Sequence, residues 1–140
     1  MATTRGPLTR NEYETLAAFR HALRRFLTFS AREARAAGLS PQQHQALLAV
    51  KGHRAGPRPS IGDLATHLQL RHHSVVGLVD RLAGRGLVRR ERSTTDRRQV
   101  GVALTTRGER LLAGLSAAHR DELRRVGPEL RALLARLDRR

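Results

Sequence analysis

Two short stretches of this 140-residue chain carry side chains suited to contacting a polyanion. The stretch "RHHSVVG", residues 71–77, groups two histidines and a serine, which can hydrogen-bond to base edges or phosphates. Beside them, Val76 is suited to a thymine methyl group, and Gly77 allows close approach because it has no side chain. The second stretch, "STTDRRQVGVALT", residues 93–105, places one carboxylate, Asp96, next to two arginines. Both stretches indicate nucleic acid as the partner.

The overall charge points the same way. The chain has 27 basic residues, all arginine except Lys51, against 12 acidic residues, which gives a formal net charge of +15. Such an excess favours a polyanionic partner. The alternative is that the arginines reflect the coding bias of a GC-rich genome and simply solvate helix faces, so the argument depends on where they lie.

Composition excludes several classes of protein. There is no cysteine, so disulfides, thiolate metal sites and cysteine redox sensing are excluded. No apolar run approaches the roughly 20 residues needed to span a bilayer, and the start "MATTRGPLTR" lacks a signal-peptide core. We therefore expect a soluble cytoplasmic protein with no membrane association. All four aromatic residues lie in the first 30 positions, which disfavours a base-stacking, RNA-binding sheet.

Catalytic and metal-binding arrangements are not evident either. The histidines outside the 71–77 stretch are scattered without a ligand-spaced pair on one helix: His21, His44, His53, His67 and His119. No serine, histidine and acid combination and no paired carboxylates suggest an active site. We expect no enzyme activity, no cofactor and no metal.

Capping signals and apolar spacing predict helices in the first half of the chain. Thr9 and Glu12 form a capping-box pattern ahead of apolar residues spaced by three and four, which predicts a long helix to about Ala36. Ser40, followed by Pro41 and Gln43, predicts a second helix that ends near Gly52. A loop, "GHRAGPRPS", follows, with Arg58 as a possible stub of strand.

The next segment predicts a helix-turn-helix motif. A short helix begins at Ser60 with Asp63 three residues later, and a turn falls at Gln69 and Leu70. A further helix, closed by Gly84 and Gly86, has an inward stripe of Val75, Leu78, Val79 and Leu82. Two short helices joined by so tight a turn form this motif.

A hairpin and terminal helices complete the predicted order. The segments "LVRRERS" and "QVGVALT" alternate in polarity around a polar turn, which predicts a two-stranded hairpin. Thr105 is placed to cap a further helix, and "GP" at 127 and 128 is expected to break it and leave a separate last helix. The fold class is mainly α with a small β-hairpin, a winged helix-turn-helix.

This architecture assigns roles to the basic stretches. The second helix of the motif enters the major groove, and its predicted outward face comprises His72, His73, Ser74, Val76, Gly77 and Arg81. The hairpin, or wing, can place arginine in the adjacent minor groove, and its predicted DNA-contacting residues are Arg89, Arg90, Arg92, Asp96, Arg97 and Arg98. Exposed histidines are often only solvated, and Asp96 is either a counter-charge that orients an arginine or a solvated turn residue.

The hairpin and its surroundings resemble the MarR family of bacterial transcriptional regulators. The family's wing signature is D-x-R, then five residues, then L-T, and this chain has Asp96, Arg98, "QVGVA", Leu104 and Thr105. The segment "LVDRLAGRGLVRR", residues 78–90, is similar to the end of the family's recognition helix and its first wing strand. The resemblance extends from about residue 9 to 138.

The resemblance implies a homodimer on double-stranded DNA. It describes residues 1–140 as a single MarR-type domain, with dimerisation helices at 9–39 and 105–138 and a DNA-binding region at 40–104. Unpaired apolar stripes on the terminal helices fit this, because one protomer has no further layer to cover them. In the family Arg98 reaches the minor groove and Asp96 orients a nearby arginine.

Two positions depart from the family pattern. Arg71 stands where relatives commonly have a serine or threonine helix cap, and His44 stands where an aromatic residue is frequent. Many relatives bind small aromatic acids or phenols near the second position, so Phe19, Phe26 and His44 are candidates for an effector cleft. The alternative is that these three are ordinary core and interface residues.

The expected function is therefore a sequence-specific regulator of transcription. The leading interpretation is a repressor that binds a pseudo-palindromic operator as a homodimer and is released by a small aromatic or phenolic ligand. The competing interpretation is a cationic protein that coats nucleic acid without sequence preference. The operator, the regulated genes, the effector and the sign of regulation are not encoded in any recognisable pattern.

Overall fold

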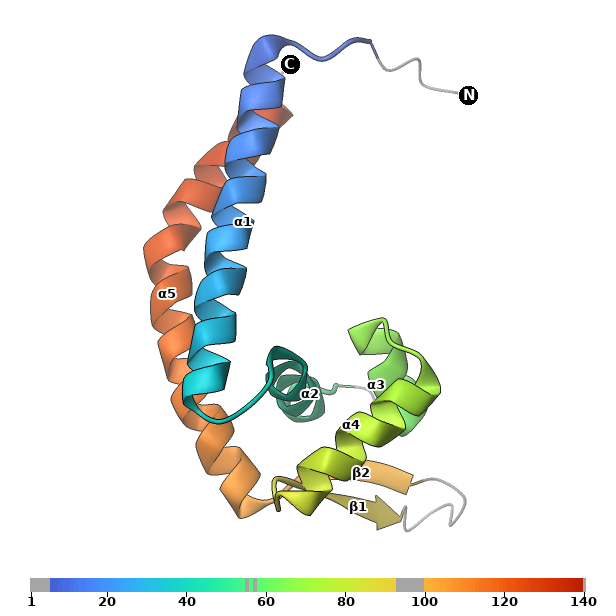
Figure 1. Cartoon of the computed structure of the whole chain (residues 1–140). Helices are drawn as coiled ribbons and strands as arrows, with labels where there is room; N and C mark the ends of the chain where they lie inside the picture. Colours follow the sequence, from blue (N-terminus) through green and yellow to red (C-terminus); the bar gives the residue numbers. More distant parts are fainter. Residues whose placement is uncertain (1–5, 55, 57, 93–99, 140) are drawn as a thin grey trace. The chain divides into compact units, whose positions relative to one another are not determined.

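The computed structural model describes residues 6–54, 56, 58–92 and 100–139. They form two compact units. The terminal unit comprises residues 1–30 and 118–140, and the central unit comprises residues 31–117. The elements, drawn in Figure 1, are α1 (Arg10–Ala36), α2 (Pro41–Lys51), α3 (Ile61–Leu68), α4 (His72–Gly84), β1 (Val88–Arg92), β2 (Val100–Leu104) and α5 (Thr106–Asp138).

Helix starts in the central unit follow the predicted capping signals. Ser40 accepts a hydrogen bond from the Gln43 N–H, and the Gln43 side chain bonds back to the Ser40 N–H, so the first turn of α2 has a complete capping box. Ser60 and Asp63 make the same reciprocal pair at the start of α3. The backbone N–H of Ser60 is the main cause that lowers the pKa of Asp63 below its ordinary value.

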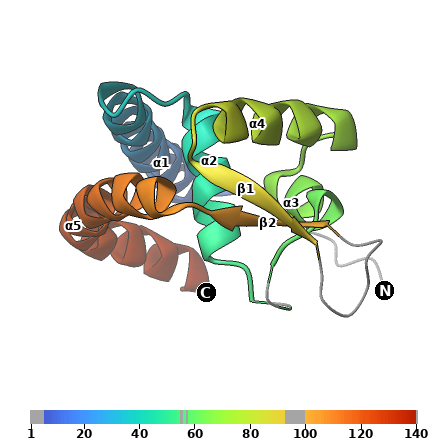
Figure 2. The same cartoon turned by 90° about the horizontal axis from the view of Figure 1, so that it is seen from below.

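The core of the central unit lies between α2, α3, α4 and the hairpin. Its most buried large side chains include Leu47, Leu64, Leu82, Leu87 and Val102. The predicted inward stripe of α4 is confirmed, because Val75, Leu78, Val79 and Leu82 are all buried. In Figure 2 the two strands lie beside these three helices, and each helix contacts a strand.

The hairpin is antiparallel, with Val88 opposite Leu104 and Arg92 opposite Val100. A third segment lies along β2: the Val102 N–H donates to the Pro59 carbonyl over 2.9 Å, and Ser60 forms an isolated bridge with Gly101. The stub of strand expected at Arg58 is thus centred on Pro59 and Ser60 instead. Pro59 can take part because only its carbonyl is needed, which proline retains.

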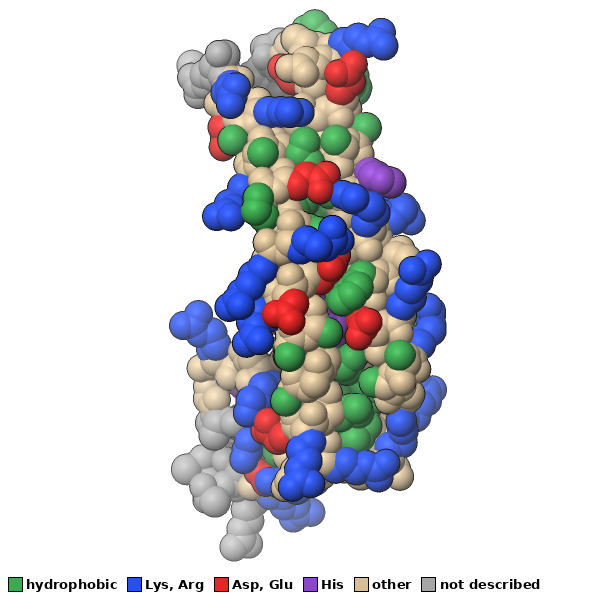
Figure 3. All heavy atoms as spheres, turned by 90° about the vertical axis from the view of Figure 1, so that its left-hand side faces the viewer, with side chains coloured by type: hydrophobic (Ala, Val, Ile, Leu, Met, Phe, Trp, Pro, Cys, Tyr) green, Lys and Arg blue, Asp and Glu red, His purple; other side chains and the backbone are tan. Residues whose placement is uncertain are grey.

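The terminal unit pairs α1 with α5 in an antiparallel arrangement (Figure 1). Its buried side chains among the described residues are few, and only Leu133 is large: Thr15, Ala22, Ser30, Val126 and Leu133. Larger apolar side chains of the same helices are exposed, namely Tyr13, Leu16, Leu23, Leu27, Leu123, Leu134 and Leu137. Figure 3 shows hydrophobic side chains at the surface among arginines and acidic groups.

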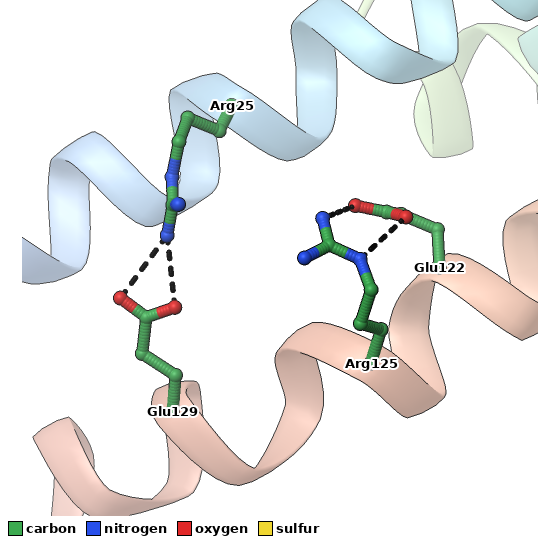
Figure 4. Close-up of polar contacts among 4 residues, drawn as sticks. All are labelled: Arg25, Glu122, Arg125 and Glu129. Atoms are coloured by element: carbon green, nitrogen blue, oxygen red, sulfur yellow. Dashed lines mark hydrogen bonds and ion pairs between the residues drawn. The ribbon is translucent and has the colours of Figure 1, made fainter.

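In the terminal unit one ion pair joins α1 to α5 and another lies within α5 (Figure 4). Arg25 of α1 donates to both carboxylate oxygens of Glu129 on α5, over 2.8 and 3.1 Å. One turn earlier on α5, Arg125 pairs with Glu122 and lowers the pKa of that carboxyl. Because this pKa is lowered, the contact persists at neutral pH and is lost only as pH falls through it.

Two phenylalanines of α1 surround a histidine of α5. The ring of His119 lies edge-on to Phe26 at 6.0 Å and to Phe29 at 5.4 Å between ring centroids. The His119 Nε2 atom is 2.8 Å from the Ser30 hydroxyl. His119 is therefore part of the packing between these two helices.

The prediction of a break at Gly127 and Pro128 is wrong, because α5 is one helix with Pro128 inside it. Proline in a helix normally clashes with the side chain of the preceding residue and lacks one N–H donor. Here the preceding residue is Gly127, which has no Cβ and so removes part of the clash. Burial of Val126 and Leu133 on either side favours continuing the helix.

A close backbone contact joins the hairpin to α5. Thr105 caps α5 as predicted, since its hydroxyl accepts from the Gly108 N–H, and the same hydroxyl donates to the Gly86 carbonyl over 2.6 Å. The Leu87 carbonyl accepts from the Thr105 N–H over 3.1 Å. A methyl group on Gly108 would lie 2.1 Å from that carbonyl oxygen, so only glycine fits.

We expect Gly108→Ala to lower the free energy of unfolding by about 1–3 kcal/mol, because the β1 backbone or α5 must move to admit the methyl group. Gly114→Ala, on the same helix with no atom within 4 Å of the added methyl, should instead raise it by about 0.5–1 kcal/mol. Urea denaturation of both variants measures the difference. Equal effects would contradict the contact at Gly108.

Candidate nucleic-acid interface

The first turn of α4 presents its polar side chains to solvent. His72, His73, Ser74 and Arg81 are exposed, whereas Val76 and Gly77 are half-buried. A methyl group on Gly77 would meet only the Arg81 guanidinium, at 3.9 Å. Gln69 sets the direction of α4 by adopting a left-handed conformation, φ 55°, in the turn after α3. The predicted set thus lies on one helix, with four of its six members exposed.

The start of α4 is also positively charged and has no side-chain cap. Arg71 occupies the N-cap position with φ −71° and ψ 150°, makes no capping hydrogen bond, and the first turn contains no acidic residue. The free backbone N–H groups and the helix dipole therefore add to the charge of Arg71 instead of being neutralised. This combination suits an anion such as a phosphate.

The base of the wing is tied to α4 by an ion pair. Arg90 of β1 donates to Asp80 of α4 over 2.6 Å. Because alternate residues of a strand share a face, Arg90 and Arg92 lie on the same face as the buried Val88. Arg92 is exposed. The pair links β1 to α4 within the central unit.

The opposite face of β1 carries a second cluster. Arg89 donates to Glu91 over 2.8 Å and to the Leu104 carbonyl over 3.0 Å. Arg58, from the segment before α3, donates to the other carboxylate oxygen of Glu91 over 3.0 Å. Arg89 first, and then Arg58, lower the pKa of Glu91 below its ordinary value, so this carboxylate is charged at neutral pH.

The remaining predicted residues are placed as follows. Asp96, Arg97 and Arg98 lie outside the described residues. Of the three effector-cleft candidates, Phe19 and Phe26 are half-buried on α1 in the terminal unit, and His44 is buried on α2 in the central unit. Among the residues that the structure describes, no group of three metal-ligating side chains is found, and no helix has the length and apolarity to cross a membrane.

Sequence reasoning missed the internal partners of the arginines. Asp80 and Glu91 are the only acidic residues between Asp63 and Asp96, and each pairs with arginine. Their isolation within a basic region was the available signal. Arg85 also has a partner within the protein, because it donates to the Gly38 carbonyl over 2.6 Å.

A helix-turn-helix whose second helix has an exposed first turn, followed by a hairpin, defines a winged helix-turn-helix protein. A family model described as "MarR family" matches residues 37–99. A probable transcriptional regulator from Pseudomonas aeruginosa shares 30% sequence identity over 84% of this chain and 92% of its own, with a TM-score of 0.60. The chain belongs to the MarR family of DNA-binding transcriptional regulators, which are not enzymes.

Two further solved structures share the fold across nearly the whole chain. AbsC, a MarR family transcriptional regulator from Streptomyces coelicolor, has 24% identity and a TM-score of 0.73 over 96% of this chain and 91% of its own. A MepR mutant from Staphylococcus aureus, bound to an oligodeoxyribonucleotide, has 19% identity and a TM-score of 0.67 over 94% and 96%. No curated protein sequence gives a significant match.

Because the N-cap of α4 is unused, it can be tested by substitution. Arg71→Ser should raise the free energy of unfolding by about 1 kcal/mol, since the backbone already has the extended conformation that a capping serine requires. Arg71→Ala is the control, because it removes the same charge without supplying a cap. If serine and alanine give equal stability in chemical denaturation, the helix start is not limited by capping.

Proposed function

We propose that the protein is a homodimeric repressor that binds a pseudo-palindromic operator and acts in the cytoplasm. The DNA-binding region is residues 40–104, flanked by dimerisation helices at 9–39 and 105–138 within one domain of residues 1–140. In this proposal the major groove is read by His72, His73, Ser74, Val76, Gly77 and Arg81. The wing contributes Arg89, Arg90, Arg92, Asp96, Arg97 and Arg98.

The observation that carries this proposal is the uncapped, basic and exposed start of α4. A solvated surface helix gains stability from an N-cap and from acidic residues in its first turn, and α4 has neither. A helix whose first turn meets DNA instead benefits from free N–H groups and positive charge. The DNA-bound structure of the MepR mutant supports the same use of this fold.

The exposed apolar side chains of the terminal unit support a dimer. Burying one leucine side chain contributes about 1.5–3 kcal/mol, so a partner covering several of these residues gains a large stabilisation. A symmetric dimer would place two recognition helices about one DNA turn apart, roughly 34 Å. That spacing matches a pseudo-palindromic site.

Release by a small aromatic or phenolic ligand is the second part of the proposal. It rests on the family resemblance and on Phe19, Phe26 and His44 as candidate ligand contacts. A ligand releases DNA only by binding more tightly to a conformation that does not fit the operator. Hydroxybenzoic acids added to a preformed operator complex test this part, and an unchanged complex would remove it.

A non-specific coating protein is the competing function, favoured by the net charge of +15. A competition titration distinguishes the two functions by comparing the affinity for the intergenic DNA beside the protein's own gene with the affinity for random duplex. A preference of about a thousandfold or more for one palindrome supports a specific regulator. Equal affinity for both duplexes supports coating.

Substitutions in the recognition helix and the wing should have different signatures on the operator. His73→Ala should change the ranking of operator variants, because a base contact is lost, with little change in the salt dependence. Arg98→Ala should lower the magnitude of the log–log salt slope by about one, because a phosphate or minor-groove contact is lost. Identical variant rankings remove His73 from base readout, and an unchanged salt slope removes Arg98 from the interface.

The wild-type protein should scatter light as a dimer at micromolar concentration. Leu27→Glu should shift it towards monomer, because Leu27 is the most exposed leucine of α1 and a carboxylate there opposes apolar packing. Leu48→Glu, at an exposed leucine of α2 in the central unit, is the matched control and should leave the dimer intact. A folded wild-type monomer would overturn the dimer.

A further inference from the structure

The Glu91 carboxylate lies between two arginines within the proposed DNA-binding region. One oxygen accepts from Arg89 Nε over 2.8 Å, and the other accepts from Arg58 Nε over 3.0 Å. The two arginine side chains are each about half exposed, and Glu91 is about one-third exposed. All three groups are therefore within reach of solvent and of a ligand, yet they satisfy one another. We call this set the Arg58–Glu91–Arg89 cluster.

The backbone is shaped to admit this cluster. Glu91 lies directly opposite Gly101 in the hairpin, and Arg58 crosses β2 at that glycine. A methyl group on Gly101 would lie 2.4 Å from the Arg58 Cβ, so any larger residue there would displace Arg58. The hydrogen bond from Val102 to Pro59 holds the segment next to Arg58 against the same strand. The placement of Arg58 beside Glu91 thus depends on the backbone of β1, of β2 and of the segment at Pro59, in addition to the attraction between the side-chain charges.

The positions of the cluster and of the Arg90–Asp80 pair differ in one respect. Arg90 and Asp80 connect β1 to α4 on the face that carries Val88, whereas the cluster lies on the other face of β1. Glu91 therefore is not needed to fasten the wing to the recognition helix. Its effect falls on two cations that would otherwise be available to any nearby phosphate.

We propose that Glu91 is a specificity-determining residue that keeps Arg58 and Arg89 from contacting the phosphates of non-operator DNA, so that the wing contact of Arg89 forms on the operator alone. This inference rests on the proposed function, because specificity has meaning only for a regulator that selects an operator. Phosphate contacts contribute affinity on every sequence, whereas base contacts contribute only on the operator. A carboxylate that occupies two arginines lowers the contribution of phosphate contacts and leaves the contribution of base contacts unchanged. It therefore raises the ratio of operator affinity to random-duplex affinity.

Neutralising Glu91 should free both arginines from their carboxylate. Arg89 keeps its bond to the Leu104 carbonyl through Nη1, and its other guanidinium nitrogens become available to a phosphate. Each additional phosphate that is neutralised increases the magnitude of the slope of log affinity against log salt concentration by about 0.9. Glu91→Gln should therefore increase the magnitude of this slope for random duplex by about two. The affinity for random duplex should rise more than the affinity for the operator, and their ratio should fall. Loss of a merely structural contact would weaken binding to both duplexes and would not steepen the slope.

The experiment measures the binding of the full-length protein to operator and random duplexes by fluorescence anisotropy, across a salt series. Glu109→Gln is the matched control, since it removes an exposed carboxylate paired with Lys51 in the same unit and changes the net charge equally. The control should change the slope by less than one. Arg58→Gln combined with Glu91→Gln leaves only Arg89 to be released, so the gain in slope should fall to about one.

The outcomes separate the inference from the proposed function. Equal slopes for Glu91→Gln and Glu109→Gln, with wild-type preference for the operator intact, overturn the role of Glu91 alone. Wild-type protein with equal affinity for both duplexes overturns the proposed function, whatever Glu91→Gln does. Thermal melting of each variant in the absence of DNA confirms that the compared proteins are folded. Glu91→Asp, which keeps the charge, is a further control and should leave the slope unchanged. If Glu91→Gln melts early, Arg58→Gln is measured in its place: an unchanged slope is expected, because Glu91 already occupies Arg58, and a shallower slope overturns the role of Glu91.

Discussion

The contact between the Leu87 carbonyl and Gly108 determines how the central unit is assembled. Leu87 ends the turn after α4 and precedes β1, so its backbone is shared by the recognition helix and the wing. The same carbonyl accepts from Thr105, whose hydroxyl both caps α5 and bonds to Gly86. Four elements therefore meet within a few residues, and their relative positions depend on a helix start that tolerates no side chain at position 108. The buried stripes of α4 and β2 pack in a register that is compatible with this contact.

Six of the described arginines of the central unit fall into two groups that composition does not distinguish. Arg85, Arg89 and Arg90 are bound within the protein to a carbonyl or a carboxylate, and Arg58 is bound to Glu91. Arg71 at the start of α4, in contrast, makes no capping bond, and Arg92 is exposed. Fewer arginines are consequently available to DNA than the number of arginines in these segments implies. This division gives a physical reason why a strongly basic protein can retain sequence preference, since non-specific affinity depends on the number of phosphates neutralised.

Local signals predicted most of the fold because they are decided by neighbours in the sequence. The capping boxes at Ser40 and Ser60, the buried stripe of α4 and the cap at Thr105 all depend on residues within a few positions. The break at Pro128 was predicted on the same local basis and is wrong, because tertiary packing on both sides of the proline outweighs one missing hydrogen bond. Predictions about the site were weaker for a similar reason. The exposed first turn of α4 follows from helical periodicity, but the pairing of Arg58 with Glu91 joins positions 33 residues apart and depends on the gap at Gly101.

Pro128 gives α5 an uneven stiffness along its length. Because proline has no N–H, the Arg124 carbonyl one turn earlier receives no helical hydrogen bond, and sharp bends in helices occur at such positions. Val126 and Leu133, which flank the proline, remain buried, so bending there need not detach the helix from α1. A helix that can change its curvature at one defined point can adjust to the surface packed against it. The missing hydrogen bond at Pro128 thus marks one defined point along the terminal unit at which α5 can bend.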